Sequence, residues 1–411
     1  MWKPGSVDLD NVDAIKQQAM QFVDLNAELI RQLALDIHAR PEPNYEEVFA
    51  SARATEVLDE FGFDVEHGVA DLPTAFVATC RGTRPGPTVG LVAEYDCVPD
   101  VGHGCGHNLI CAATVAAGMG LSSVSGALPG VIKVFGTPAE EGGKGKMPMA
   151  GRGVFEHLDA ALQFHPATRA GVTTVNMLAQ NIFCSFRGTP AHTTAVPWEG
   201  LNALDAVIAV FNGVNAMRQQ VHPDIRITGI ITDGPTTIAS IPERAAAMFR
   251  VRGFDEAMVL EVVERVKDCA RGAALQTGTR VEIGHEPVEP ALRCSETLTE
   301  LFTQAGTAFE IAGDDRDRGY GTTDLAFIGQ LTPTLMFRLA SWPPGTPAHS
   351  QAAVEASKSE AALQSMLVAA KLLISMSIDL LSDADLLGRV RTEFAAQRSA
   401  KTNGRSIVAE F

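Results

Sequence analysis

A complete series of alternating elements between residues 181 and 285 is the feature that most constrains the fold. Apolar segments typical of strands and amphipathic segments typical of helices follow one another in the order strand, helix, strand, strand, helix, strand: 181–186, 200–220, 226–231, 245–252, 255–275 and 280–285. This order describes a ferredoxin-like unit, which is complete in itself. We therefore expect a unit at 178–288 inserted into a larger domain.

The segments on either side alternate between helix and strand and indicate an α/β fold. Helices are expected at 14–37, 45–61, 109–121, 297–309 and 357–381, and strands at 75–78, 88–92, 131–136, 160–164 and 334–338. The polar tail after Leu387 is expected to fray at its end. We predict a catalytic α/β domain with a mixed sheet, formed by 1–177 and 289–411, because 411 residues exceed one ordinary core.

Charge and cysteine content limit the partners and the compartment. The net charge of -16 repels phosphate backbones and anionic lipid, so we expect no binding to nucleic acid or membrane surfaces. Residues 1–8 lack the pattern of a secretory signal, and the longest apolar stretch, 363–378, is short and carries Lys371. Seven cysteines without a framework spacing suit a reducing compartment, and we expect a cytoplasmic protein.

The densest chemical segment is a glycine-rich stretch that closely follows a predicted strand. Glu94-Tyr95-Asp96 is followed by Gly102-His103-Gly104-Cys105-Gly106-His107-Asn108. Glycine allows a tight backbone turn, so alternate side chains can converge, and thiolate and imidazole are good ligands for zinc-like cations. The alternative is a glycine-rich turn in which the histidines have no ligand role. A metal site is the stronger interpretation for His-x-Cys-x-His beside a sheet.

Further candidates lie where other predicted strands end. Glu140 and Glu141 follow one strand, where α/β sheets place active sites, and His165 ends another. One carboxylate can ligate metal while its neighbour moves protons. Three more segments are weak signals individually, and their joint order carries the weight: Gly188 to His192, Gly321-Thr322-Thr323-Asp324 and Pro347-Ala348-His349-Ser350.

From Glu94 to Ser350 the order of these motifs resembles the M20 family of metallopeptidases and aminoacylases. It is closest to the amidohydrolase branch with aminobenzoyl-glutamate hydrolases, in which a cysteine replaces an acidic bridging ligand. The resemblance implies two divalent cations, Mn(II) or Zn(II), with Cys105 as the bridge. It implies that four further residues complete the ligand set: His107, Glu141, His165 and His349.

The same resemblance assigns roles to the remaining candidates. Glu140 corresponds to the general base, and Asp96 to the carboxylate that orients a ligand histidine. His192 corresponds to a histidine of the inserted lid that reaches the active site of the partner protomer, which implies a homodimer. The proton chemistry agrees with these roles, because Glu140 can pass a proton from water to the leaving nitrogen, and His192 can stabilise an oxyanion.

The lid departs from the family pattern at one position. The family has Asn-aliphatic-aliphatic-Pro, whereas this chain has Ala239-Ser240-Ile241-Pro242. Arg252 stands at the matching arginine and is expected, with Thr323, to bind a substrate carboxylate. A salt bridge within the lid is the alternative role for Arg252. Arg316 and Arg318 could replace the missing amide, although solvated loop arginines are common.

Three functions are compatible with these residues. The first is hydrolysis of an amide C–N bond in a small N-acyl or N-aroyl amino acid or dipeptide. The second is a metal-dependent deaminase that releases ammonia from a small aromatic compound, which the missing asparagine motivates. The third is a metal-binding scaffold without activity, and the retained Glu140 argues against it because a scaffold needs no base. The fold alone does not choose among them.

Overall fold

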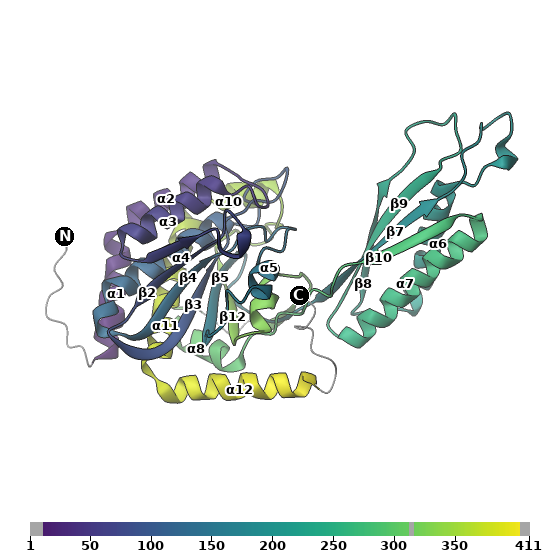
Figure 1. Cartoon of the computed structure of the whole chain (residues 1–411). Coiled ribbons are helices and arrows are strands. Elements are labelled where there is room, and N and C mark those ends of the chain that lie inside the picture. Colours follow the sequence, from purple (N-terminus) through teal and green to yellow (C-terminus); the bar gives the residue numbers. More distant parts are fainter. Residues whose placement is uncertain (1–10, 312–315, 403–411) are drawn as a thin grey trace.

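The computed structural model describes residues 11–311 and 316–402 of the chain. The start at 1–8, for which the sequence predicts no secretory signal, lies outside these residues, as does the end of the polar tail after 402. Within the described part, the chain forms a large α/β body and a second, smaller unit that projects from it (Figure 1).

The large body is built on a mixed sheet, as the sequence predicts. Its eight strands lie in the order β1-β2-β4-β3-β5-β12-β6-β11. Parallel pairs join β4, β3, β5 and β12, whereas β1 with β2, β2 with β4, and β12 with β6 run antiparallel. The strands are β1 (Asp64–His67), β2 (Phe76–Arg81), β3 (Arg84–Ala93), β4 (Pro129–Gly136), β5 (Ala160–Ala167), β6 (Gly171–Asn176), β11 (Arg316–Gly319) and β12 (Thr334–Ala340).

Two apolar helices, α4 (His107–Ser123) and α11 (Glu360–Ser382), pack against each other and against the central strands. Every side chain of α4 from His107 to Leu121 is buried, which explains a helix that is apolar on all sides. By length and composition α11 could span a membrane, but 72% of its apolar window is buried in this core. Around them lie α1 (Val12–Leu25), α2 (Ala27–Ala39), α3 (Val48–Glu60) and α8 (Glu296–Thr307).

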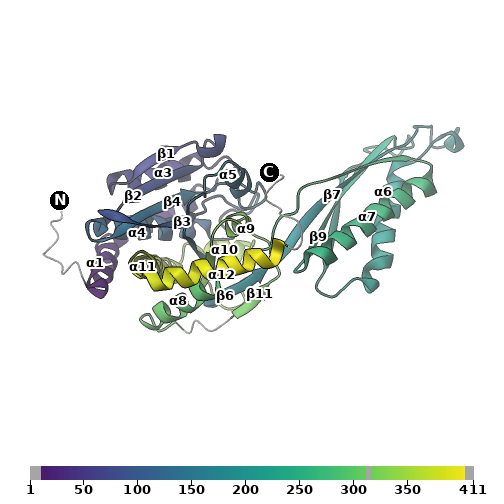
Figure 2. The same ribbon diagram turned by 60° about the horizontal axis from the view of Figure 1, so that its bottom comes forward.

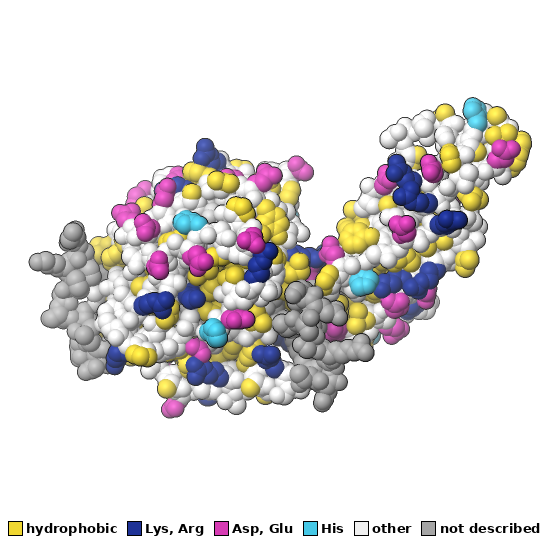
Figure 3. Space-filling view, in the orientation of Figure 1, with side chains coloured by type: hydrophobic (Ala, Val, Ile, Leu, Met, Phe, Trp, Pro, Cys, Tyr) yellow, Lys and Arg dark blue, Asp and Glu magenta, His cyan; other side chains and the backbone are white. Residues whose placement is uncertain are grey.

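The second unit has the expected order β-α-β-β-α-β and its own apolar core. Its four strands form an antiparallel sheet in the order β10-β7-β9-β8. Figures 1 and 2 show this sheet extending away from the large body, and Figure 3 shows a narrow waist between the two parts. The elements are β7 (Leu178–Arg187), α6 (Ala203–Met217), β8 (Arg226–Asp233), β9 (Arg244–Gly253), α7 (Glu256–Thr277) and β10 (Arg280–His285).

Local differences from the sequence prediction have physical causes. The helix expected at 14–37 divides into α1 and α2 at Asn26, whose side-chain amide donates to the carbonyl of Phe22. The strands β1, β6 and β11 were not predicted, because β1 (DVEH) and β11 (RDRG) are short and polar and β6 (GVTTVN) contains only two apolar residues besides glycine. Residues 384–402 form a helix that the sequence did not predict, α12 (Ala384–Thr402), whose Leu386, Leu387 and Val390 are buried; the end of the tail, where fraying is expected, lies outside the described residues.

Candidate active site

Adjacent parallel strands bring the predicted residues to one edge of the large sheet. Glu94 and Asp96 follow β3, Glu140 and Glu141 follow β4, and His165 lies near the end of β5. The order β4-β3-β5 makes these strands neighbours, so their carboxyl ends meet, where α/β sheets place ligands. The sequence therefore places these side chains close together through strand order.

The glycine-rich loop depends on two close approaches. Gly106 has φ +74 and precedes α4, and a Cβ there would lie 2.6 Å from Cγ of Pro166. This contact holds His107, the first residue of α4, against β5. The backbone N–H of His349 donates to the carbonyl of Gly104 at 2.9 Å, and His349 itself has φ +58. Left-handed backbone in a non-glycine residue is strained, and such strain clusters at functional sites.

The five predicted ligands converge in two overlapping groups of donor atoms. Cys105, His107 and His165 form one, Cys105, Glu141 and His349 form the other, and within each group the atoms lie within 4.8 Å of one another. Cys105 Sγ is 3.6 Å from His165 Nε2, and His349 Nε2 is 3.5 Å from a carboxylate oxygen of Glu141. Cys105 is common to both groups, which is the placement that a bridging ligand needs.

Asp96 orients two of the donor residues, His107 and Glu141. One carboxylate oxygen accepts from His107 Nδ1 at 2.9 Å, and the other accepts from the backbone N–H of Glu141 at 2.9 Å. His165 is fixed similarly, because its Nδ1 donates to the carbonyl of Pro166 at 2.8 Å. Both histidines thus direct Nε2 into the cluster, the usual arrangement for metal-ligating imidazoles. Among the described residues, no hydrogen-bond partner satisfies buried His107 Nε2 or Glu141 Oε1, so these atoms fit a cation.

The protonation of the cluster also suits metal binding. Burial lowers the pKa of His165 to about 4, so its imidazole is neutral and able to ligate. Burial raises the pKa of the Cys105 thiol, so this group needs a cation to become a thiolate and is a poor free nucleophile. Burial and the carboxylates of Glu94 and Asp324 raise the pKa of Glu140 well above its ordinary value.

A buried lysine beneath Glu140 was missed at the level of sequence. Lys146 is fully buried, and its Nζ lies 2.6 Å from Glu94 Oε1 and 2.5 Å from Asp324 Oδ1. Burial would lower the pKa of Lys146, but Asp324, Glu94 and Glu140 raise it, so the ammonium keeps its charge. Lys146 thereby offsets part of the negative charge around Glu140. Its position five residues after Glu141, at the start of the short helix α5 (Lys146–Gly151), was the available signal.

A cavity of about 740 Å³ opens over the cluster and is lined by residues from both units. Arg252 of β9 lines this cavity, and no hydrogen bond or ion pair within the described chain engages its guanidinium; burial and neighbouring Arg250 lower the pKa of Arg252. Arg250 instead pairs with Glu289 at 2.7 Å. The ion pair at this end of β9 is therefore made by Arg250, and it joins the inserted unit to Glu289 just beyond it. Thr323 also lines the cavity, although its hydroxyl accepts from the N–H of Leu325.

Other predicted residues lie away from this cavity. Arg252 and the turn before Arg244 stand at opposite ends of β9, so Ala239 is separated from Arg252 by more than about 27 Å of strand. The loop of Ala239 contacts that of His192, whose Nδ1 accepts from two backbone N–H groups. The structure thus does not place Ala239 and Arg252 around one cavity of a single chain.

The two arginines considered as substitutes for the missing amide are engaged elsewhere. Arg316 pairs with Glu296, and Arg318 packs 3.7 Å over the ring of Phe254 and pairs with Asp224 at 3.2 Å. Neither lines the cavity over the donor cluster. Within one chain, neither arginine therefore offers a substitute for the asparagine at this cavity.

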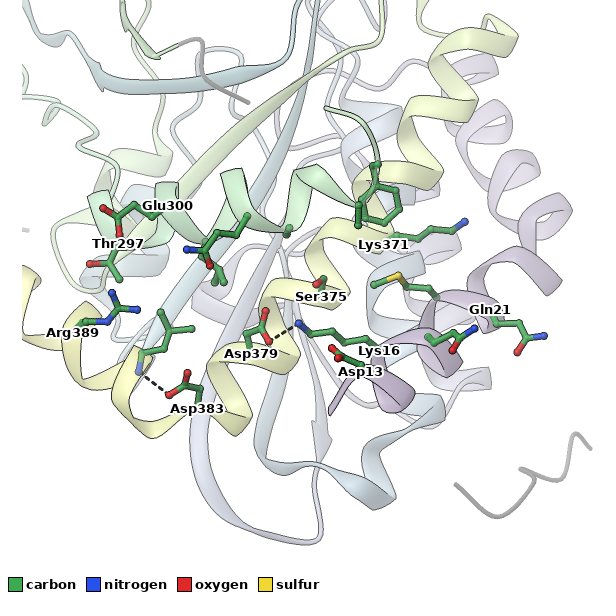
Figure 4. Close-up of a pocket in the computed structure, with 18 of the residues that line it drawn as sticks. Asp13, Lys16, Gln21, Thr297, Glu300, Lys371, Ser375, Asp379, Asp383 and Arg389 are labelled. Atoms are coloured by element: carbon green, nitrogen blue, oxygen red, sulfur yellow. Dashed lines mark hydrogen bonds and ion pairs between the residues drawn. The ribbon is translucent and has the colours of Figure 1, made fainter. Parts of the chain in front are cut away.

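A larger cavity, of about 900 Å³, lies between α1, α8, α11 and α12, away from the cluster (Figure 4). Polar side chains at its wall pair with one another: Lys16 with Asp379 at 2.5 Å and Lys371 with Asp24 at 2.6 Å. Its described lining contains no cysteine or histidine, and its size gives it no claim to be the active site.

The fold and the cysteine, histidine and carboxylate donors at its central strands define an α/β protein with a candidate metal centre. Comparison with known proteins agrees: residues 90–376 match the model of "Peptidase family M20/M25/M40". The chain is 32% identical over 424 residues to a mouse (Mus musculus) Xaa-Arg dipeptidase, covering 95% of each protein. It is 30% identical over 345 residues to a chain of the p-aminobenzoyl-glutamate hydrolase of Escherichia coli (strain K12), covering 78% of this protein and 70% of that one.

A solved structure described as a dinuclear metal-binding peptidase of the M20 family from Bacillus subtilis superposes with a TM-score of 0.67 at 17% identity, covering 87% of this chain and 99% of that one. At this identity the likeness establishes the fold. The family match covers well over half of the chain, so the chain belongs to the peptidase family M20/M25/M40. It is a metal-dependent hydrolase that acts on C–N bonds, as the sequence predicts.

Proposed function

We propose that this hydrolase cleaves the amide bond of a small N-acyl or N-aroyl amino acid or dipeptide with a free carboxylate. Two divalent cations, Mn(II) or Zn(II), would be held by the two donor groups that share Cys105. The proposal depends on one observation: Cys105 belongs to both donor groups, and the buried atoms His107 Nε2 and Glu141 Oε1 beside it have no hydrogen-bond partner among the described residues. When bound, such cations lower the pKa of water and polarise a carbonyl group.

The residues of the chain supply the proton transfers and the orientation. Glu140 is absent from both groups that contain Cys105, and it lies with His107 and Glu141 in a third group whose donor atoms are also within 4.8 Å of one another. This places its carboxylate beside the proposed cations, where it can accept a proton from water and donate it to the leaving nitrogen. Asp96 holds His107 and the backbone of Glu141 in place. Lys146 pairs with Glu94 and Asp324, and its positive charge reduces the repulsion among the buried carboxylates around Glu140.

The cavity supports a carboxylate-bearing substrate. Arg252 offers a partly desolvated guanidinium that no acidic side chain of the described residues engages, and the planar fork of arginine suits a carboxylate. The mouse and Escherichia coli relatives carry names that refer to a dipeptide and to an aroyl-glutamate. A substrate of that size suits a cavity of about 740 Å³ better than a long peptide does.

We also propose that the working form is a homodimer joined through the unit at 178–288. His192 and Ala239 lie beyond the far end of β7 and β9 from Arg252, so His192 serves the site only if it reaches that of a second copy. The edge strand β8 is unpaired on its outer side in the described sheet, and Ile230 and Ile231 on it are more than half exposed. Edge strands with exposed apolar side chains favour pairing with another chain.

We propose a cytoplasmic location, because the ligand role of Cys105 requires a free thiol. All seven cysteines are unpaired thiols, and a cysteine ligand must remain reduced. A reducing compartment keeps Cys105 available to cations.

The test is a substrate panel of N-acyl amino acids, N-aroyl amino acids and dipeptides, assayed with Mn(II) or Zn(II), in which free amine and ammonia are scored separately. We expect release of an amino acid from at least one carboxylate-bearing substrate. Release of ammonia from aromatic amines with no amide hydrolysis would overturn the proposal in favour of a deaminase.

A further inference from the structure

The turn between α2 and α3 contains a buried carboxylate that the proposed chemistry does not use. Glu47 immediately precedes α3 and is fully buried. One of its carboxylate oxygens accepts from the backbone N–H of Ala139 at 2.9 Å and from that of Tyr45 at 2.8 Å. The other oxygen accepts from the hydroxyl of Thr74 at 2.9 Å. Glu47 therefore joins three separate segments, one of which leads directly into the active site.

Ala139 is the residue that Glu47 holds, and its backbone is strained. It has φ +60, a left-handed conformation that alanine adopts at a cost, and it directly precedes Glu140 and Glu141. Such a conformation persists only where surrounding contacts enforce it. The bond from Ala139 N–H to Glu47 is a contact of this kind, because it fixes the peptide orientation at the start of the Glu140–Glu141 segment.

Tyr45 holds the other end of the same loop. Its hydroxyl donates to the carbonyl of Gly143 at 2.5 Å, and a Cβ on Gly143 would lie 2.6 Å from the Tyr45 ring. Tyr45 also has a left-handed backbone, with φ +64, and the Glu47 carboxylate stabilises that turn by accepting its N–H. The segment 139–143 is therefore held at both ends by one short turn of the chain.

The arrangement is not one that stability alone favours. Burial raises the pKa of Glu47 to about 7, so keeping this carboxylate ionised inside the protein costs free energy that its hydrogen bonds do not fully recover. A buried apolar side chain would avoid this cost but could not accept from Ala139. The cost is understandable if the position of the loop matters to the active site.

We propose that Glu47, assisted by Tyr45, is a positioning residue that sets the orientation of Glu140 and Glu141. Glu47 touches neither substrate nor cation and acts through the backbone of Ala139. The inference rests on the proposed function, because it takes Glu140 as the base and Glu141 as a ligand. Asp96 holds the same loop at the N–H of Glu141, two residues after Ala139, so the two carboxylates fix nearby parts of one segment.

The test compares Glu47→Ala, Glu47→Gln and Tyr45→Phe with the wild type, each loaded with Co(II). Visible absorption of the bound Co(II) reports the ligand geometry, and kcat, KM and melting temperature are measured on the same samples. We expect Glu47→Ala to lower kcat about 10–100-fold, with KM within about twofold and altered Co(II) bands. Glu47→Gln retains an acceptor oxygen for Ala139 and should recover most of kcat. Tyr45→Phe should give a smaller change in the same direction.

Glu42→Ala is the matched control. Glu42 is a carboxylate of the same turn that accepts from the backbone N–H groups of Phe49 and Ala50, without touching the 139–143 loop through its side chain. Its loss should lower the melting temperature and leave kcat and the Co(II) bands as in the wild type. Equal loss of kcat in Glu42→Ala and Glu47→Ala would overturn the inference, because destabilisation alone would then explain both.

Two further results separate the possible failures. If Glu47→Ala does not fold, Tyr45→Phe decides, with Glu47→Gln as the variant expected to stay close to the wild type: wild-type kcat and Co(II) bands in Tyr45→Phe would refute the positioning role. If the wild type itself neither binds Co(II) nor hydrolyses any amide, the proposed function fails, whatever the variants do. If the wild type hydrolyses amides and Glu47→Ala is equally active, the positioning role is refuted while the proposed function stands.

Discussion

Replacing Arg252 with alanine tests how the cavity recognises its substrate. In the described structure the guanidinium forms no direct ion pair, although the nearby carboxylate of Glu289 raises its pKa against the lowering by burial, and its neighbour Arg250 carries the same charge. A hydrogen bond to a charged group contributes about 1.5–3 kcal/mol, and each 1.4 kcal/mol corresponds to about a tenfold change in affinity. We therefore expect Arg252→Ala to raise KM about 10–150-fold for a carboxylate-bearing substrate. Because the lost binding is common to ground and transition states, kcat should change little.

The stability of the same variant distinguishes recognition from a structural role. Removing an unpaired, partly desolvated charge beside Arg250 should leave the melting temperature unchanged or raise it slightly. Arg250→Ala is the matched contrast two residues away on β9, since it breaks the 2.7 Å ion pair with Glu289 and should lower the melting temperature. Arg252→Lys keeps the charge without the planar fork and should have an intermediate KM. An Arg252→Ala enzyme with unchanged kinetics and reduced stability would refute the reasoning.

Four further outcomes are expected. Cys105→Ala should lose bound metal together with activity, and wild-type metal content by elemental analysis would contradict its ligand role. Lys146→Met leaves the buried carboxylates of Glu94 and Asp324 unpaired and should lower the free energy of unfolding by about 3–5 kcal/mol in urea titrations; a loss below about 1 kcal/mol would be inconsistent with this pairing. Ile231→Lys on β8 should give monomers in sedimentation, whereas Leu25→Lys on α1, an apolar site that is also more than half exposed, should not; a dimeric Ile231→Lys would argue against the β8 interface. The pKa of Glu47 in the folded protein, about 7, lies above its ordinary value of 4.5, so the protonated carboxyl stabilises the fold below pH 4.5 and this contribution is lost as pH rises through 7. The stability of the wild type relative to Glu47→Gln should therefore fall between these pH values. Parallel pH profiles of melting temperature for the two proteins would count against this shift.

Strand order explains why much of the site could be predicted from sequence. Cys105, Glu141 and His165 follow or end apolar segments that become β3, β4 and β5, and parallel strands bring their carboxyl ends together. Local spacing also predicts the order of the second unit, because each of its elements has a clear period and length.

The features that the sequence did not reveal depend on contacts between residues far apart in the chain. Glu47 is 92 residues from Ala139, and Lys146 is 178 residues from Asp324, so no local pattern reveals either contact. Arg252 and Ala239 are close in sequence, yet β9 separates them, and only the strand register shows this. The environment of Arg318 was equally hidden from the sequence, because the arginine stacks on Phe254, a residue of the other unit.

The most direct test of the central claim is the metal content of Glu140→Gln, measured by elemental analysis alongside its turnover. Glu140 borders the donor cluster, while the five donors that include Cys105 remain intact in this variant. We expect two cations per chain, as in the wild type, with kcat lower by at least about 10²–10⁴-fold. Near-normal turnover, or a loss of cations that parallels the loss of turnover, would contradict the division between a base at Glu140 and ligands at the remaining positions.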